Sequence, residues 1–348
     1  MKQQEIIKGF AQLGILMRAL GANEEWTDFS IGVTKEEYED LQYTINRQVS
    51  YNGWFVKENV RKSLNALGSL LNEDDLNNWT KTYSFNESPK RVAVIMAGNI
   101  PLVGFHDFLC VLVSGHHVVA KLSSEDRTLL PKLAEVLVQL VPSLKERITF
   151  SEGKISDIEA VIATGSNNSL KFFEEYFGKY PHIFRKNRTS IAVITGEESK
   201  EQLENLGEDI FTYFGLGCRN VSHLFIPQDF ELSRFFEAIV PHHEVIHNNK
   251  YGNNYDYHKA IFLLNKVELL DNNFVLLKKS EELFSPLAML HYHRYSENPE
   301  VEEYLTKHKE DIQVVVGMNY LPFGKAQKPE LNDYADGIDT MSWLTSLK

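Results

Sequence analysis

The sequence predicts an α/β protein with two parallel-sheet domains that follow an N-terminal helical region. Residues 1–85 contain apolar side chains at helical spacing, and from Arg91 onward short apolar runs of strand length alternate with helical segments. Strands that alternate with helices are typical of a parallel sheet covered on both faces. A chain of 348 residues is long enough to form two such domains.

The composition is that of an ordinary soluble globular protein, with 43% hydrophobic and 24% charged residues. A net charge of −12 argues against broad binding to nucleic acid, which requires a basic face. The two cysteines, Cys110 and Cys218, provide neither a disulfide framework nor zinc-ligand spacing, as expected in a reducing compartment. The histidines show no spacing typical of a metal site, so we predict no metal.

The sequence predicts neither a secretory signal nor a membrane span. Charged residues interrupt the apolar residues at the N-terminus, so no secretory h-region forms. The most apolar stretch, 102–120, contains Asp107 and three histidines, which favours a buried helix and strand over a membrane span. We therefore expect a cytoplasmic protein.

The N-terminal region is predicted to be helical and carries no recognisable catalytic group. Apolar residues between Ile6 and Leu20 form one helical stripe, and 36–47 and 55–71 are further amphipathic segments. A polar connector, 84–90, separates this region from the alternating part of the chain.

The alternating part divides into two blocks near 186–190, which predicts domains 1–188 and 189–348. In the first block we predict strands at 92–97, 118–121, 148–150 and 160–163, and helices ending near 113 and spanning 129–140 and 168–177. In the second block we predict strands at 191–194, 221–226, 260–264, 274–277, 287–292 and 312–316, and helices at 199–213, 231–240 and 301–307.

Cys218 is the main candidate for a catalytic residue. It follows Gly215 and Gly217 between a predicted helix and a predicted strand, and the two glycines allow a sharp bend that leaves the sulfur uncovered. Arg219 follows directly, and a neighbouring cation favours the nucleophilic thiolate. The alternative is a free cysteine that packs as a small hydrophobic residue.

Four other short motifs lie in or beside predicted turns. They are Gly98-Asn99-Ile100-Pro101, the stretch from Gly115 through Lys121 to Ser124, Ala163-Thr164-Gly165-Ser166, and Glu282-Leu283-Phe284-Ser285-Pro286. Each has a plain structural explanation when taken alone, because Asn and Pro are common in turns and Ser and Thr cap helices. A full Gly-x-Gly-x-x-Gly fingerprint is absent, which disfavours an ordinary Rossmann dehydrogenase.

In this order, the four motifs and Cys218 resemble the aldehyde dehydrogenase superfamily and, within it, the acyl-CoA reductases of the LuxC type. The resemblance covers most of residues 90–330 and implies an aldehyde-dehydrogenase-like fold with two Rossmann-like parallel-sheet domains. It implies that 1–188 contains the N-terminal helices and the dinucleotide-binding domain, and that 189–348 is the catalytic domain with a C-terminal segment. Members of the superfamily usually assemble as dimers or tetramers, which predicts a homo-oligomer.

The resemblance implies two catalytic residues. Cys218 matches the nucleophile of the family. Asn99 matches the asparagine of the family's Asn-aromatic-Pro turn, whose side chain helps to form the oxyanion hole. An amide N–H aimed at a developing oxyanion is what acyl chemistry requires.

The resemblance also implies how the adenosine end of a dinucleotide is bound. Lys121 matches the lysine that contacts the adenosine ribose, although Leu122 replaces the proline that usually follows it. Ser124 stands where NAD-preferring members carry a glutamate, which bonds the ribose 2′-hydroxyl and repels a 2′-phosphate. We therefore expect NADP(H) rather than NAD(H).

Two motifs match the rest of the dinucleotide site. Thr164, Gly165 and Ser166 match a turn whose backbone N–H groups and hydroxyl lie near the pyrophosphate, and a helix N-terminus favours an anion there. Glu282 matches the residue that holds the nicotinamide ribose, and Phe284 matches the one that packs beside the ring.

One departure from the superfamily bears on the reaction. Hydrolytic aldehyde dehydrogenases carry Glu-Leu-Gly-Gly, whose glutamate activates water, where this chain has Arg185-Lys186-Asn187-Arg188. Loss of this base suits an enzyme whose thioester exchanges with coenzyme A. The basic residues either stabilise the Cys218 thiolate or coenzyme A phosphates, or form a solvated charged edge.

We therefore predict an acyl-CoA reductase that converts a fatty acyl-CoA or another acyl thioester to an aldehyde with NADPH through a cysteine acyl-enzyme. A CoA-independent aldehyde dehydrogenase, or a non-catalytic subunit that carries an acyl group or binds a partner, stays open. In the resembled family an acyl-protein synthetase can be the acyl donor. The polar stretch 322–339 either closes the site, forms a subunit contact or, on the simplest interpretation, is a surface loop.

Overall fold

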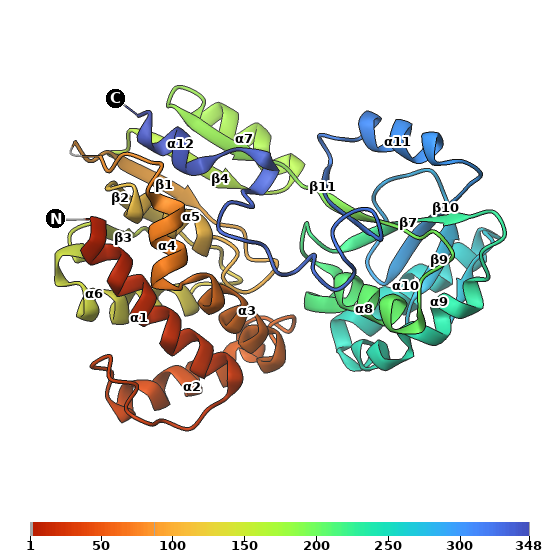
Figure 1. The fold of residues 1–348 in the computed structure, drawn as a ribbon, viewed down its shortest axis with the longest axis horizontal. Helices are drawn as coiled ribbons and strands as arrows, with labels where there is room; N and C mark the ends of the chain where they lie inside the picture. The colour runs from red at the N-terminus through yellow and green to blue at the C-terminus, as the bar shows by residue number, and fades with distance from the viewer. Residues whose placement is uncertain (1–2, 87, 348) are drawn as a thin grey trace. The chain divides into compact units, whose positions relative to one another are not determined.

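The computed structural model describes residues 3–86 and 88–347, which form two compact units (Figure 1). Unit 1 contains the chain up to Lys186 together with the segment from Glu330 onward, and unit 2 is Asn187–Pro329. The division lies close to the predicted boundary at 188/189. The C-terminal segment, which the sequence places in the second domain, packs with unit 1.

The N-terminal region is helical, as predicted. Its helices are α1 (Gln3–Ala22), α2 (Lys35–Tyr51), α3 (Lys57–Leu70) and α4 (Glu73–Thr80). The apolar stripe of α1 is buried in the core of unit 1. Helices α1 and α3 pack closely, because a Cβ added to Gly14 would lie 2.8 Å from the carbonyl oxygen of Leu71.

Unit 1 contains a parallel sheet in the order β3-β2-β1-β4-β5. The strands are β1 (Arg91–Ile95), β2 (His117–Lys121), β3 (Ile148–Phe150), β4 (Ala160–Thr164) and β5 (His182–Arg185). The helices that connect them are α5 (Phe105–Val113), α6 (Leu129–Leu140) and α7 (Asn167–Phe177), with a 3-10 turn at Pro142–Leu144. Successive strand residues face opposite cores, one shared with α5 and α6 and the other with α7.

Unit 2 contains a second sheet in the order β11-β6-β7-β10-β9-β8, parallel except for the pair β8 and β9. The strands are β6 (Thr189–Val193), β7 (Val221–Pro227), β8 (Leu270–Asp271), β9 (Leu276–Lys279), β10 (Met289–Tyr295) and β11 (Ile312–Gly317). The helices are α8 (Lys200–Phe211), α9 (Leu232–Ile239), α10 (Asn249–Leu264) and α11 (Asn298–Lys307), with 3-10 turns η2 (Thr212–Gly215) and η3 (Val240–His247). Figure 1 shows α11 on the opposite face of this sheet from α8 and α9.

The prediction of a strand at 260–264 is wrong, because these residues form the last turns of α10. A short apolar run has the same composition in a strand and in a helix, and only its surroundings decide. Here Asn248 caps the helix by accepting hydrogen bonds from the backbone N–H groups of Lys250 and Tyr251. The apolar run ends at the surface, since Leu264 is 82% exposed.

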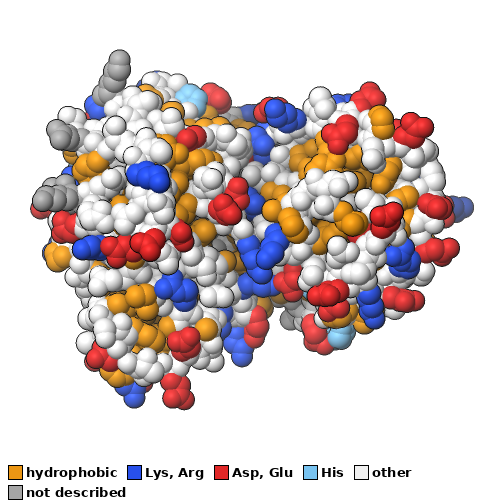
Figure 2. Space-filling view, viewed as in Figure 1, with side chains coloured by type: hydrophobic (Ala, Val, Ile, Leu, Met, Phe, Trp, Pro, Cys, Tyr) orange, Lys and Arg blue, Asp and Glu red, His pale blue; other side chains and the backbone are white. Residues whose placement is uncertain are grey.

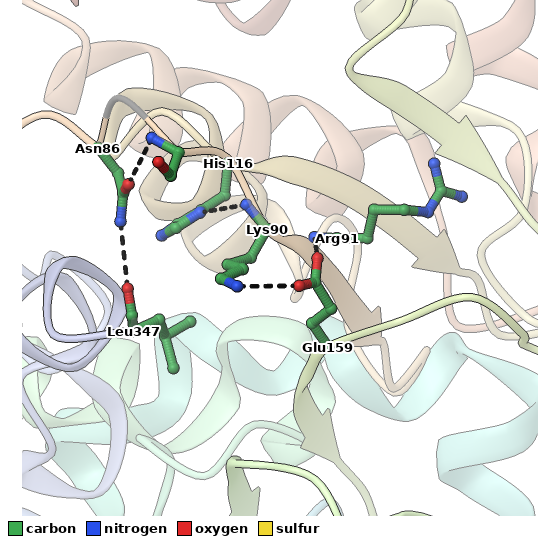
Figure 3. A network of polar contacts seen from close by, with 7 residues as sticks. Asn86, Lys90, Arg91, His116, Glu159 and Leu347 are labelled. Atoms are coloured by element: carbon green, nitrogen blue, oxygen red, sulfur yellow. Dashed lines mark hydrogen bonds and ion pairs between the residues drawn. The ribbon is translucent and has the colours of Figure 1, made fainter.

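The C-terminal segment is anchored on unit 1 by buried side chains and by backbone groups. Met341 and Leu344 of α12 (Thr340–Thr345) are fully buried. His116 is also fully buried, and it connects the backbone before β1 to α12. Lys90 donates its backbone N–H to His116 Nδ1 at 3.0 Å (Figure 3), so the proton is on Nε2, which donates to the carbonyl oxygen of Leu344 at 2.9 Å. Asn86 reaches the carbonyl oxygen of Leu347 at 3.4 Å. Within 322–339 itself Ala326 and Tyr334 are buried, so the interpretation of this stretch as a surface loop is incomplete.

Tyr334 connects this segment to the N-terminal helices through a chain of hydrogen bonds. Trp79 Nε1 donates to the Tyr334 hydroxyl at 2.8 Å, which lies 3.0 Å from the hydroxyl of Tyr83. Tyr83 in turn donates to Asp339 at 2.9 Å. Each hydroxyl in this chain both accepts and donates, which strengthens its neighbours.

Tyr334→Phe is expected to lower the free energy of unfolding of unit 1 by about 1–2 kcal/mol, because it leaves the buried Trp79 N–H without its acceptor. The shift of the midpoint in urea-induced unfolding measures this loss. Tyr176→Phe is a matched control, since Tyr176 is 60% exposed on α7 and should leave the midpoint unchanged. An equal midpoint for Tyr334→Phe and wild type would contradict the expectation.

Candidate functional site

Unit 2 contains a cavity of about 230 Å³ at the amino edge of its sheet. Three loops contribute to its lining: Asn187–Arg188 before β6, Gly215–Gly217 before β7, and Phe284–Pro286 before β10. Because β6, β7 and β10 are parallel neighbours, their amino ends meet at one edge. The fold therefore brings together three segments that the sequence singled out separately.

Cys218 lies in the loop between η2 and β7 and is half-buried. The adjacent Gly217 lines the cavity, whereas the cysteine itself lies one residue beyond the lining. Ser190 Oγ donates to the carbonyl oxygen of Cys218 at 3.1 Å and fixes the backbone of the loop against β6. Arg219, the adjacent cation, donates its Nε–H to the carbonyl oxygen of Ala326.

The other cysteine has a different environment. Cys110 is fully buried in α5, and burial raises the pKa of its thiol. A buried neutral thiol is unreactive, because the thiolate is the nucleophile. The interpretation of a cysteine as a small packed hydrophobic residue thus describes Cys110.

The backbone just before Cys218 is strained. Tyr213 (φ 54°), Phe214 (φ 59°) and Gly215 (φ 78°) are three consecutive residues in the left-handed region. Glycine adopts this conformation readily, but each of the two aromatic residues costs about 1–3 kcal/mol and needs surrounding structure to hold it. Both aromatic side chains are buried, which supplies part of that support. Backbone strain of this kind clusters at functional sites.

Asn220 holds the segments on either side of this strained backbone. Its side-chain oxygen accepts from Gly217 N at 2.8 Å, and its Nδ2 donates to the carbonyl oxygens of Asp209, Ile210 and Thr212 at 2.9–3.2 Å. The side chain is 2% exposed, so these bonds are shielded from water. Sequence reasoning missed this residue. The only local signal was an asparagine two positions after the cysteine, and asparagine is the kind of side chain that both donates and accepts.

Asn220→Ala is expected to lower the free energy of unfolding of unit 2 by about 2 kcal/mol, because it leaves buried backbone groups unpaired. The loosened loop should also raise the rate at which iodoacetamide alkylates Cys218. Peptide mass spectrometry measures that rate. Asn220→Asp is the matched variant: it keeps the acceptor for Gly217 but turns a charged oxygen toward three carbonyls, and should be no better than alanine. Wild-type kinetics in both variants would contradict a supporting role.

The four basic or amide residues at 185–188 do not act as one group. Arg185 is buried in unit 1, where Nη1 pairs with Asp107 and Nη2 donates to Thr340 Oγ1 at 2.8 Å. Asn187 and Arg188 line the cavity of unit 2, and Arg188 Nη1 donates to the carbonyl oxygen of Ile312 at 3.2 Å. The alternative of a solvated charged edge does not describe Arg185 or Arg188, since both side chains are largely buried.

The loop before β10 carries Glu282 and Phe284. Glu282 is exposed, and its Oε2 lies 3.8 Å from Lys278 Nζ. Phe284 lines the cavity and is 40% exposed, so part of its ring lies in solvent beside the cavity. Ser285, where the resembled family has glycine, donates its hydroxyl to the carbonyl oxygen of Met289 at 2.6 Å. The hydroxyl therefore holds the turn into β10.

In unit 1 the remaining predicted residues follow three neighbouring parallel strands. Asn99 lies exposed in the turn after β1, Ser124 lies exposed after β2, and the turn 164–166 follows β4. Lys121, the last residue of β2, donates to the carbonyl oxygens of Glu152 and Gly153 at 2.6 and 2.9 Å. The carboxyl edge of a parallel sheet, where the strand order reverses, is where such folds bind ligands.

Two glycines let the turns at this edge pack closely against neighbouring serine side chains. A Cβ on Gly98 would lie 2.5 Å from Ser123 Oγ, and one on Gly165 would lie 2.8 Å from Ser169 Cβ. Ser166 caps α7 by accepting from Ser169 N at 3.2 Å, which is the capping role that the sequence left open. The result is a compact turn at a helix N-terminus, a geometry that suits a phosphate group.

Other classes of site receive no support from the described residues. In 3–86 and 88–347, no three His, Cys, Asp or Glu side chains are grouped so as to hold a metal ion. None of the helices in these ranges is long and apolar enough to cross a membrane. On the face shown in Figure 2, acidic side chains are scattered over the surface and not gathered in one patch.

Comparison with known proteins gives two matches of different kinds. A family model described as acyl-CoA reductase (LuxC) matches residues 20–239. No protein of curated function matches the chain. Solved structures with a similar fold include the aldehyde dehydrogenase KauB from Pseudomonas aeruginosa, which is 11% identical with a TM-score of 0.64 over 91% of this chain and 72% of that one.

Two further structures have dinucleotides in their descriptions. A mutant of P. syringae indole-3-acetaldehyde dehydrogenase in complex with NAD+ and IAA is 12% identical, with a TM-score of 0.62 over 89% of this chain and 71% of that one. An NADP-dependent enzyme from E. coli is 12% identical, with a TM-score of 0.58 over 90% and 72%. At this identity the likeness shows the fold, and it confirms the predicted aldehyde-dehydrogenase-like α/β architecture with its N-terminal helices.

Proposed function

Because the chain belongs to the LuxC family of acyl-CoA reductases, we propose that it reduces a fatty acyl-CoA or another acyl thioester to an aldehyde through an acyl-enzyme on Cys218. One observation carries the assignment of the site. The cavity of unit 2 is lined by the residue that precedes Cys218, by Phe284, and by the segment that replaces the hydrolytic motif. The proposed reaction requires the nucleophile, the nicotinamide contact and the segment that lacks the hydrolytic glutamate to lie close together.

In this proposal the Cys218 thiolate attacks the thioester carbonyl, and the coenzyme A thiolate leaves with the electrons of the broken C–S bond. The Asn99 side-chain amide and the Cys218 backbone N–H stabilise the oxyanion, a contribution of about 10²–10³ in rate for each donor. NADPH, when bound, would supply a hydride to the carbonyl carbon of the acyl-cysteine. The C–S bond would then break, so that aldehyde leaves and its electrons return to Cys218 as the thiolate. Glu282 and Phe284 would hold the nicotinamide end, and the turn 164–166 would hold the pyrophosphate.

The residues of unit 1 fit such a cofactor. The N-terminus of α7 offers backbone N–H groups to a phosphate, and Gly165 lets the turn before α7 pack closely against that helix. The part of the cavity that the structure describes also lacks a residue that could act as the hydrolytic base. Among the described residues that line the cavity there is no Asp or Glu that could activate water for hydrolysis. This composition favours reduction over the oxidation of aldehyde to acid.

Ser124→Glu is expected to lower kcat/KM for NADPH by about 10-fold or more and to raise kcat/KM for NADH, because a carboxylate there repels a 2′-phosphate and bonds a free 2′-hydroxyl. Ser124 is exposed at the carboxyl edge of the sheet, so the longer side chain fits without disturbing the core. Steady-state rates with each cofactor test this. Glu125→Gln is the control for a general change of charge, and an unchanged ratio for Ser124→Glu would contradict the preference for NADPH.

The overall proposal is tested by incubating the protein with a long-chain acyl-CoA and NADPH and following cofactor oxidation and aldehyde release. Cofactor oxidation with aldehyde release is the expected result. Activity only with aldehyde and oxidised cofactor would identify a CoA-independent dehydrogenase. Inactivity in both directions would leave a subunit that carries an acyl group or binds a partner, and an acylated synthetase would then be the donor to test. A homo-oligomer, as in the wider superfamily, is part of the same proposal and is measured by light scattering.

A further inference from the structure

Side chains from three other elements hold three consecutive carbonyl groups of the loop before β10. Tyr304 of α11 donates its hydroxyl to the carbonyl oxygen of Glu281 at 2.8 Å, and Ser222 of β7 donates to that of Leu283 at 3.0 Å. Between them, the carbonyl oxygen of Glu282 accepts two hydrogen bonds, one from His223 Nδ1 at 3.0 Å and one from His291 Nδ1 at 2.8 Å.

The protonation of both histidines follows from their shared partner. A carbonyl oxygen only accepts hydrogen bonds, so each Nδ1 carries a proton, and a neutral ring then has none on Nε2. Both side chains are almost completely buried, at 0% and 1% exposed, and neither Nε2 has a hydrogen-bond partner among the described residues. Burial lowers the pKa of both rings, so they stay neutral near pH 7.

Burying two imidazoles between β7, β10 and the loop costs more free energy than burying two apolar side chains there. His223 and His291 are register partners on the adjacent strands β7 and β10, and the same face is otherwise packed by apolar and aromatic side chains such as Phe225. A leucine or phenylalanine at either position would avoid a buried nitrogen without a partner. What the histidines provide in return is a pair of N–H donors aimed at one backbone oxygen.

The loop needs these donors because it has no regular structure. Residues 280–288 are in neither helix nor strand, and the carbonyl groups of 281–283 belong to no ladder of backbone hydrogen bonds in the described part of the chain. Side chains that hold three successive carbonyls define the path of the backbone and thus the directions in which Glu282 and Phe284 leave it. A displacement of about 1 Å in such a segment can cost about 100-fold in rate.

We propose that Ser222, His223, His291 and Tyr304 form a carbonyl clamp that positions Glu282 and Phe284 for the nicotinamide end of the cofactor. This inference rests on the proposed function, since that function assigns the cofactor to this loop. The four are positioning residues, because they act through the backbone of the loop. The clamp should serve the reduction step alone, as acylation of Cys218 by acyl-CoA requires no dinucleotide.

The test compares His291→Leu with His291→Asn in the full chain. Leucine removes the donor, whereas the side-chain amide of asparagine places an N–H close to the position of Nδ1 and should rescue the loop. Acylation is measured without cofactor as coenzyme A released on mixing with acyl-CoA, and reduction as NADPH oxidised in a single turnover. For His291→Leu we expect acylation within about 2-fold of wild type, a KM for NADPH raised about 10-fold and a reduction rate lowered about 10- to 100-fold. Asparagine should recover most of both losses.

Equal losses of acylation and reduction in His291→Leu, or no change in either parameter for NADPH, would overturn the clamp. Tyr304→Phe is a second, milder variant in case leucine prevents folding: it removes one hydroxyl at the rim of the clamp and should raise the KM for NADPH in the same selective way. Failure of the proposed function gives a different result, because the wild type itself would then release no coenzyme A. Even if the wild type is inactive, hydrogen exchange of the backbone amides in 280–288 tests whether the clamp holds the loop. Faster exchange in His291→Leu supports the clamp, and unchanged exchange refutes it.

Discussion

Replacing Cys218 with serine is expected to abolish the acyl-enzyme and to lower aldehyde formation by a factor on the order of 10³ or more. A thiol ionises far more readily than an alcohol, and the thiolate is the attacking species. The substitution changes one atom in a half-buried loop whose backbone is held by Ser190 and Asn220, so the fold should survive. Intact-protein mass spectrometry after mixing with acyl-CoA measures the adduct directly.

Cys110→Ala is the matched control for this experiment. Cys110 lies in the core of unit 1 and its thiol is kept neutral by burial, so the variant should form the same adduct as wild type. Alkylation with iodoacetamide should likewise modify Cys218 in wild type and spare Cys110 until the protein unfolds. An adduct that persists in Cys218→Ser, or one that disappears in a folded Cys110→Ala, would mean that the acyl group is carried elsewhere.

The elements that could be predicted from sequence are those whose apolar pattern is long or strongly alternating. Helix α6 occupies the predicted residues 129–140, and β3 the predicted 148–150. Strand β5 was not predicted, because its ends, His182 and Arg185, are polar and only the fold places it at the edge of the sheet. The packing of 330–347 on unit 1 could not be predicted either, since it depends on partners such as Trp79 that are distant in sequence.

The same division applies to the site. Motifs of consecutive residues could be predicted, because a cysteine after two glycines or an asparagine before a proline has a local physical meaning. Asn220 and the histidine clamp could not. His223 lies within the predicted strand 221–226, whose pattern does not tell which way its side chain points, and only the pairing of β7 with β10 places it beside His291 at the carbonyl of Glu282. Side chains that act through the backbone of another segment leave no pattern in their own neighbourhood.

Asp107→Ala is expected to lower the free energy of unfolding of unit 1 by about 3–5 kcal/mol, because it leaves the buried Arg185 guanidinium without its counter-charge. Both side chains are almost inaccessible to water, at 7% and 5% exposed. The pair is already incompletely satisfied, since Asp107 Oδ1 and Arg185 Nε have no hydrogen-bond partner among the described residues. Urea-induced unfolding, monitored by circular dichroism, gives the change in midpoint.

The double variant Asp107→Leu, Arg185→Met separates the cost of a lone charge from the value of the pair. Removing both partners should recover most of the stability, because an apolar pair of similar size avoids the desolvation of two ions. Cofactor binding need not recover with it. The Arg185 carbonyl oxygen accepts from Gly165 N at 3.3 Å, and its side chain donates to Thr340, so the residue ties the turn proposed to hold the pyrophosphate to α12. A double variant that is as stable as wild type but binds NADPH several-fold more weakly would show that the ion pair helps to position this turn. Full recovery of both stability and NADPH binding would show that the ion pair contributes to stability alone.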